Sequence, residues 1–170
     1  MGDLGSSAIQ LVSSLLIFIF GAIICLALRR TFSSSSSRVL LIYCWHSLFS
    51  VVSFLYIITY GGDAIAYFRY SFAPDLGFSF GTAAIRFLAS FLTQGFNLSL
   101  LGCFLVFQIF GAIGLIAFDA SLREVTWHKS RNLRLLATGI VFLPSVSFWS
   151  SALGKDCLLY TSDAADEEDS

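Results

Sequence analysis

The stretch from Ala8 to Leu28 reads AIQLVSSLLIFIFGAIICLAL and contains no charged residue. A helix that crosses a bilayer needs about 20 apolar residues, so this stretch predicts a transmembrane helix. Three more stretches of similar length carry at most one charge each, and they cover residues 39–60, 97–118 and 133–153. Of the 170 residues, 56% are hydrophobic and 12% charged, about half the charged fraction of soluble domains. The sequence therefore predicts an all-α integral membrane protein with four transmembrane helices.

The basic residues predict the orientation of these spans. A signal peptide carries positive charge before its apolar run, whereas Arg29 and Arg30 follow the run here, so we expect an uncleaved first helix. Residues 29–38 contain three arginines and no acid, and residues 123–134 contain four basic residues against one glutamate. Basic connections stay on the cytoplasmic side. We therefore expect a multi-pass protein with its N-terminus outside.

The connection between the second and third spans, Gly61 to Gly81, reads GGDAIAYFRYSFAPDLGFSFG and is predicted to be an outer loop. If part of it is helical, Asp63, Tyr67 and Tyr70 share one face, because their spacings are four and three, and Arg69 lies beside that face. A carboxylate near tyrosine hydroxyls is typical of a general base or a cation ligand. A solvated loop with interfacial tyrosines explains the same residues.

Three other features are interpreted as parts of the membrane-embedded architecture. Residues 82–94 (TAAIRFLASFLTQ) are too short to span and have apolar positions at helical spacing, which predicts an interfacial amphipathic helix or a buried half-helix. His46 lies within the second span, where a hydrogen bond to a neighbouring helix is favoured over a proton relay. Asp119 and Arg123 lie four residues apart and predict a structural ion pair on one helix.

The fourth span ends in the stretch 143–156, which reads LPSVSFWSSALGKD. Pro144 predicts a bend in the helix, because proline removes a backbone donor. The small polar residues that follow recur at helical spacing and lead to a lysine and a carboxylate; the candidate ligand-binding residues here are Ser147, Ser150, Ser151, Lys155 and Asp156. Small residues let a helix or a ligand approach closely, so the serine face predicts either helix packing or a site.

Residues 157–170 (CLLYTSDAADEEDS) differ in composition from the rest of the chain. Their first part, CLLYTSDAADE, resembles the conceptual translation of a transposase-type sequencing-library adapter. We expect residues 1–156 to be the N-terminal fragment of a polytopic membrane domain and residues 157–170 to be a foreign tail; an ordinary disordered acidic tail is the alternative. Without the five acidic residues of the tail, the formal net charge changes from −1 to +4.

Segments 144–145 (PS), 148–151 (FWSS) and 154–156 (GKD) resemble a stretch in bacterial polytopic glycosyltransferases of the glycosyltransferase-C superfamily. That family carries its catalytic carboxylate in the first outer loop, before amphipathic helices, and Asp63 followed by residues 82–94 has the same order. The resemblance implies sugar transfer from a polyprenyl-phosphate donor at the outer face of the bacterial inner membrane. The family's carboxylate follows its first span, whereas Asp63 follows the second span here.

The same resemblance implies roles for three residues. Asp63 would deprotonate the acceptor, and Lys155 would offset charge on the leaving phosphate. Asp156 would orient Lys155 or hold a divalent cation as a cofactor. We expect Asp63 and Asp156 to form one site, with Tyr67 and the serine face between them. The expected partners are membrane lipid and a polyprenyl-phosphate-linked sugar, and no nucleic acid.

Two alternative functions use the same residues. The pattern Gly62-Asp63 followed by Tyr67 is similar to outer-loop motifs of bacterial exopolysaccharide and O-antigen polymerases, which join lipid-linked repeat units. A transporter subunit would instead use Asp63 and Asp156 to bind a cation or protons, although transporters hold such residues near the membrane midplane. No metal site is predicted from the cysteines, because their spacing pairs none of them; they are Cys25, Cys44, Cys103 and Cys157.

Overall fold

The computed structural model of the chain describes residues 8–73 and 81–151. Every regular element in these residues is a helix, which confirms the predicted all-α class. The helices are α1 (Ala8–Ala27), α2 (Ser36–Tyr60), α3 (Asp63–Tyr70), α4 (Thr82–Ser90), the π-helical turn η1 (Phe91–Gly95), α5 (Leu100–Thr126), α6 (Arg131–Val141) and α7 (Pro144–Ser150). Four segments, namely α1, α2, α5 and α6 with α7, are long and apolar enough to cross a membrane.

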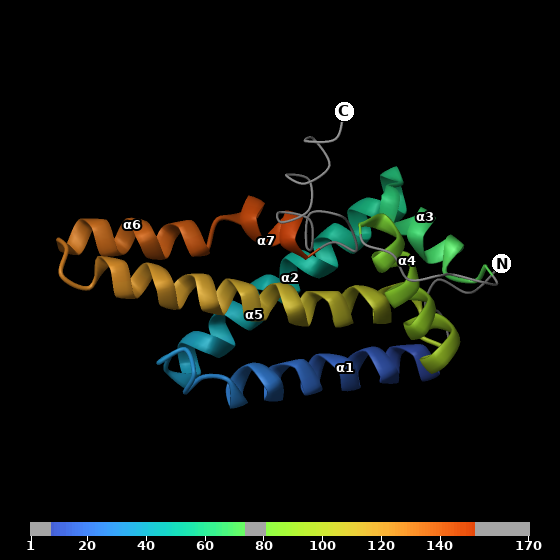
Figure 1. The fold of residues 1–170 in the computed structure, drawn as a ribbon, viewed down its shortest axis with the longest axis horizontal. Coiled ribbons are helices and arrows are strands. Elements are labelled where there is room, and N and C mark those ends of the chain that lie inside the picture. Colours follow the sequence, from blue (N-terminus) through green and yellow to red (C-terminus); the bar gives the residue numbers. More distant parts are fainter. Residues whose placement is uncertain (1–7, 74–80, 152–170) are drawn as a thin grey trace.

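These four segments form a bundle in which each runs opposite to the one before it (Figure 1). The α1–α2 and α5–α6 connections lie at one end, which we call the basic end for the arginines in and beside them: Arg29, Arg30, Arg38, Arg123, Arg131 and Arg134. The short elements α3, α4 and η1 lie at the opposite end, which we call the α3–α4 end. The bundle therefore separates helix α3, which carries Asp63, Tyr67 and Tyr70, from most of the arginines.

Local sequence explains where the long helices begin and end. Ser35 and Ser99 cap α2 and α5, because each serine Oγ accepts a hydrogen bond from the backbone N–H three residues later. Gly61 ends α2 with a φ of 84°, a conformation that glycine adopts without strain. Pro144 occupies the first turn of α7, where a missing N–H breaks no helical hydrogen bond.

The structure corrects three predicted boundaries. Residues 63–70 form α3 and are not part of a loop, because burial of Ala64, Tyr67 and Phe68 in the core stabilises a helix of only eight residues. The third span continues past residue 118 to Thr126. The fourth is not one continuous helix, since the chain leaves helical geometry at residues 142–143, just before Pro144, where the bend was predicted.

Two apolar clusters hold the bundle together. The cluster nearer the α3–α4 end joins α2, α3, α4 and α5 and includes Phe54, Ile85 and Phe104. The cluster nearer the basic end joins α1, α2, α5 and α6. Gly21 lets α1 approach closely, because a Cβ there would lie 2.5 Å from the Tyr43 hydroxyl. Large apolar side chains of α1 remain exposed on its other faces, as expected for a helix that contacts lipid.

Candidate functional site

At the α3–α4 end, α3 presents a polar and aromatic face next to α4. Asp63 is exposed in the first turn of α3, and Tyr67 is buried one turn later. The guanidinium of Arg86, from α4, lies 4.8 Å from the ring centroid of Tyr70 and 6.0 Å from that of Tyr67. Both contacts lie within the range of cation–π attraction. The helical spacing predicted for Asp63, Tyr67 and Tyr70 is therefore present in the structure.

The carboxylate and the guanidinium of this face do not neutralise each other. Both ion pairs in the described part of the chain involve Asp119, so neither Asp63 nor Arg86 is ion-paired there. The Nε atom of Arg86 is buried and has no hydrogen-bond partner among the described residues. Asp63 shares a helix face with Tyr67, which places their Cβ atoms about 5–6 Å apart. The face thus keeps one negative and one positive charge available to a ligand.

Sequence reasoning missed Arg86 as part of this face. The sequence feature that could have indicated it is that Arg86 is the one charged residue in 82–94. Within a short apolar run, however, a single charge indicates only an interruption of the apolar pattern. Arg69, predicted to lie beside the face, is exposed in the last turn of α3. Hydrogen bonds fix the far end of α3 against η1: Ser71 Oγ lies 2.9 Å from Thr93 Oγ1, and Gln94 Nε2 donates to the Ser71 carbonyl at 2.6 Å.

A second polar region, the polar junction, lies inside the bundle where α2, α5 and α7 meet. It consists of His46, Ser47, Gln108, Gly111 and Ser150. His46 Nε2 lies 3.0 Å from Ser150 Oγ, and Gln108 Nε2 donates to Ser47 Oγ at 2.7 Å. Gly111 makes the close approach possible, because a Cβ there would lie 2.7 Å from both the His46 ring and the Ser150 carbonyl oxygen. The hydrogen bond predicted for His46 is confirmed.

Several buried polar atoms of this region have no hydrogen-bond partner among the described residues. Ser150 Oγ donates to the Val146 carbonyl at 2.6 Å, so the network assigns the proton of the His46 hydrogen bond to Nε2. His46 Nδ1 is then an acceptor, and like Gln108 Oε1 it is buried without a partner among the described residues. The hydroxyls of Ser50 and Ser53, on the same side of α2 as His46, are also buried and unpartnered there.

The serine face of α7 packs into the bundle. Ser147 and Ser151 are fully buried. Ser150 contacts His46 of α2, and both lie against Gly111, which is near the middle of α5. The serine face thus contacts His46 inside the bundle, and the wall expected between Asp63 and Asp156 stays a prediction. Lys155, Asp156 and the tail 157–170 lie outside the described residues, so a site shared by Asp63 and Asp156 stays a prediction.

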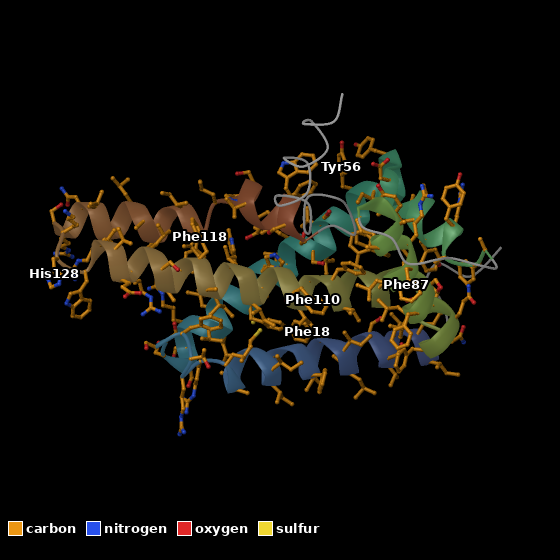
Figure 2. All side chains as sticks on the ribbon, in the orientation of Figure 1. Phe18, Tyr56, Phe87, Phe110, Phe118 and His128 are labelled. Atoms are coloured by element: carbon orange, nitrogen blue, oxygen red, sulfur yellow. The ribbon has the colours of Figure 1, made fainter. Side chains whose placement is uncertain are left out.

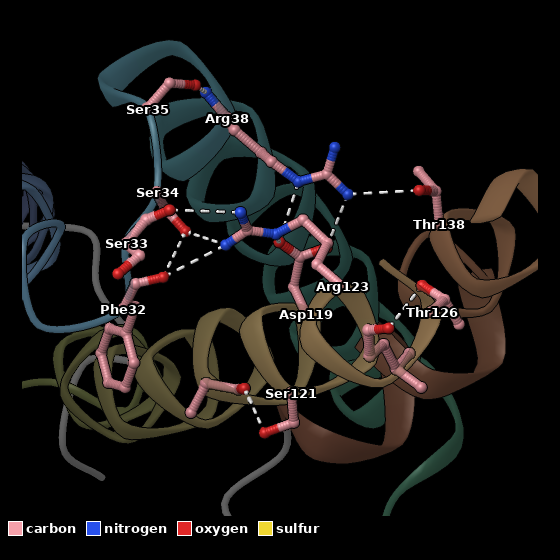
Figure 3. A network of polar contacts seen from close by, with 12 residues as sticks. Phe32, Ser33, Ser34, Ser35, Arg38, Asp119, Ser121, Arg123, Thr126 and Thr138 are labelled. Atoms are coloured by element: carbon pink, nitrogen blue, oxygen red, sulfur yellow. Dashed lines mark hydrogen bonds and ion pairs between the residues drawn. The ribbon is translucent and has the colours of Figure 1, made fainter. Parts of the chain in front are cut away.

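The basic end is held by a third polar region, the Asp119 network (Figure 3). Asp119 is 1% exposed and accepts hydrogen bonds from Arg38 at 2.7 and 2.8 Å and from Arg123 at 3.0 Å. Arg38 also donates to Thr138 of α6, and Arg123 donates to the Phe32 and Ser33 carbonyls of the α1–α2 connection. The predicted pair of Asp119 with Arg123 is confirmed, and Arg38 is an addition that the sequence pattern did not indicate.

No group of three histidine, cysteine or acidic side chains in residues 8–73 and 81–151 is placed to hold a metal ion. Comparisons of the chain with protein-family models, with curated proteins and with solved structures found no match. The resemblance to the glycosyltransferase-C superfamily therefore stays a prediction.

Proposed function

We propose that this protein is a membrane glycosyltransferase that moves a sugar from a polyprenyl-phosphate donor at its α3–α4 end. The observation that carries the proposal is the α3 face, where Arg86 lies close to the rings of Tyr67 and Tyr70 and Asp63 lies one turn before Tyr67 on the same helix. Neither charged group is ion-paired in the described part of the chain. Sugar transfer from a lipid phosphate needs a base for the acceptor and a cation for the leaving phosphate. The face supplies one group of each kind.

Each group has a defined role in the proposed reaction. Asp63 takes the proton of the acceptor hydroxyl as the acceptor oxygen bonds to the anomeric carbon of the sugar. The bond between that carbon and the phosphate oxygen breaks, and the electron pair stays on the polyprenyl phosphate. Arg86, oriented by Tyr67 and Tyr70, stabilises the negative charge that develops on this phosphate. Lys155 remains a predicted second cation.

The arrangement of charge in the bundle supports placing this reaction at the outer face. Most of the arginines lie in or beside the connections at the other end, and basic connections remain cytoplasmic. The α3–α4 end then faces outward, where Asp63 is exposed. We expect an impermeant reagent added from the outer side to label a cysteine introduced at Ala73 and to leave one introduced at Ser35 unlabelled. The reverse pattern would contradict the placement.

The enzymatic test measures release of polyprenyl phosphate from membranes that contain the protein. Polyprenyl phosphate carrying radiolabelled glucose, mannose or N-acetylglucosamine is offered in turn. Asp63→Asn is expected to slow turnover by about 10²–10⁴-fold, because it removes the base. Arg86→Gln is expected to slow it by about 10²–10³-fold. Arg30→Gln, which removes an exposed arginine at the basic end, is the matched control and should leave turnover unchanged. Equal turnover in the wild type and Asp63→Asn would refute the proposal.

A transporter subunit is the second candidate, and the polar junction favours it. Polar groups inside a membrane are costly and mark ligand or proton pathways. His46 and Gln108 are fully buried in transmembrane segments, and each keeps an acceptor atom without a partner in the described chain. The test measures uptake of a radiolabelled solute or of protons into proteoliposomes that contain the protein. Uptake that His46→Phe abolishes and Asp63→Asn retains would support this function over sugar transfer.

A further inference from the structure

A groove with a volume of about 890 Å³ lies at the basic end of the bundle. Its walls come from the C-terminal part of α5, residues 131–138 of α6, Arg38 of α2 and the α1–α2 connection. Figure 2 shows His128, one of its lining residues, at the tip where α5 turns into α6. The groove is at the opposite end from the α3 face, so a function for it is independent of the proposed sugar transfer.

The lining of the groove carries an excess of positive charge. Four arginines line it against two carboxylates: Arg38, Arg123, Arg131 and Arg134 against Asp119 and Glu124. Asp119 already binds two of these arginines. Arg131 and Arg134 are exposed, and neither takes part in an ion pair within the described part of the chain. These two side chains are therefore available to an anion, and arginine binds phosphate oxygens through two parallel hydrogen bonds.

The groove also has an apolar side of the kind that a lipid requires. Leu122 and Leu135 line it, and Leu135 is 60% exposed on a helix of the membrane-spanning set. Trp127 lines it as well and is 68% exposed at the end of α5, and tryptophan favours the boundary between headgroups and acyl chains. A ligand with a phosphate group and a hydrocarbon chain would meet both surfaces at once.

We infer that this groove binds the headgroup of an anionic phospholipid. The phosphate contacts Arg131 and Arg134, and the upper part of an acyl chain lies against Leu135 and Trp127. Basic pockets between transmembrane helices are suited to such headgroups, because the positive charge of their arginines attracts anionic lipids from the surrounding leaflet. A soluble phosphate compound would satisfy the arginines but would leave the apolar side exposed to water.

Quenching of Trp127 fluorescence by brominated lipid tests this inference directly. Trp45→Phe and Trp149→Phe leave Trp127 as the single tryptophan in the full chain, which is reconstituted in phosphatidylcholine bilayers. Dibrominated phosphatidylglycerol is compared with dibrominated phosphatidylcholine. We expect phosphatidylglycerol to be preferred on the order of tenfold at this site, since each basic residue near the surface strengthens binding of an anionic lipid several-fold.

A pair of double variants separates the groove from general surface charge. Arg131→Gln with Arg134→Gln should reduce the preference to near one. Arg30→Gln with Lys129→Gln removes the same charge from exposed residues of the same end that do not line the groove, and should keep most of the preference. Equal losses in the two double variants, or equal quenching by the two brominated lipids in the parent, would overturn the inference.

Inorganic phosphate distinguishes the two sources of the ligand. Added to bilayers that contain brominated phosphatidylglycerol, it should leave the quenching of Trp127 unchanged, because a headgroup held together with its acyl chain is not displaced by the free anion. Loss of quenching with increasing phosphate would assign the site to a soluble phosphate compound and overturn the lipid assignment. Turnover at the α3 face is not part of any of these measurements, so the two proposals fail independently.

Discussion

The Asp119 network and the polar junction both place polar side chains between three helices of the bundle, but they differ in how completely these side chains are paired. In the network, both oxygens of the buried Asp119 carboxylate accept hydrogen bonds from arginines. In the junction, Nδ1 of His46 and Oε1 of Gln108 are buried without a partner in the described chain. The charge of Asp119 is paired with two arginines, whereas the junction keeps two acceptor atoms that no described residue satisfies.

The difference follows from the charge of the groups. A buried carboxylate without partners costs several kcal/mol, so a charged group persists in the interior only when it is paired. An unpaired neutral acceptor costs about 1–3 kcal/mol, which a membrane protein tolerates at a few positions. The network therefore fixes how α2, α5 and α6 sit against each other. The junction can still accept a hydrogen bond from a donor such as water or a ligand.

The largest expected effect is that of Asp119→Asn, which removes the charge that holds Arg38 and Arg123. We expect the free energy of unfolding to fall by about 3–5 kcal/mol, because two arginines lose their buried counter-ion. Unfolding by SDS in mixed micelles measures it. Asp63→Asn, at an exposed carboxylate without an ion pair in the described chain, should change stability by less than about 0.5 kcal/mol. Similar losses in both variants would contradict the comparison.

The next effect concerns one arm of the network. Arg123→Gln removes the hydrogen bond to Asp119 and those to the Phe32 and Ser33 carbonyls, which join α5 to the α1–α2 connection. A loss of about 2 kcal/mol is expected, as for a hydrogen bond to a charged group. Arg69→Gln, at an exposed arginine of α3, is the control and should have little effect on stability. Thermal unfolding in detergent distinguishes the two variants. A loss of stability in Arg69→Gln as large as that in Arg123→Gln would contradict a stabilising role for the hydrogen bonds of the network.

Two glycines of α5 test how tightly the junction is packed. Gly111→Ala would place a Cβ 2.7 Å from the His46 ring and from the Ser150 backbone oxygen, so α5 and α7 must separate. We expect a loss of about 1–3 kcal/mol. Gly114 lies about one turn further along, and a Cβ added there would meet no neighbouring side chain or helix within 4 Å. Gly114→Ala should therefore be neutral or stabilising by up to about 1 kcal/mol. In a thermal unfolding assay, tolerance of Gly111→Ala would mean that the junction is loosely packed.

The smallest expected effect on stability is the difference between two serines of α2, one that accepts a hydrogen bond from Gln108 and one that has no partner among the described residues. Ser47→Ala leaves the Gln108 amide without its acceptor and should cost about 1 kcal/mol. Ser50→Ala removes a buried hydroxyl that has no partner in the described chain and should change stability by less than about 0.5 kcal/mol. The two residues are three positions apart and both buried, so the comparison holds position and residue type nearly constant. A larger loss for Ser50→Ala would indicate that its hydroxyl binds something in the membrane.

Features that depend on neighbouring residues in the chain were predictable. Apolar length identified the four membrane-spanning segments, and Pro144 identified the break in the fourth. The four-residue spacing of Asp119 and Arg123 on one helix identified their ion pair. Each of these follows from helix geometry or from backbone chemistry within a few residues, and needs no information about which helices are neighbours.

The tertiary structure decided which distant groups meet. Arg38 reaches Asp119 across 81 positions, His46 meets Ser150 across 104, and Arg86 of α4 lies over Tyr70 of α3. Helix α3 itself forms where the sequence suggested a loop, because the core buries one of its faces. Hydropathy and spacing determine which segments become helices and which face each can bury. The rotation and shift of one helix against another are set by side-chain packing, as at Gly21 and Gly111, and only that packing decides which polar groups find partners.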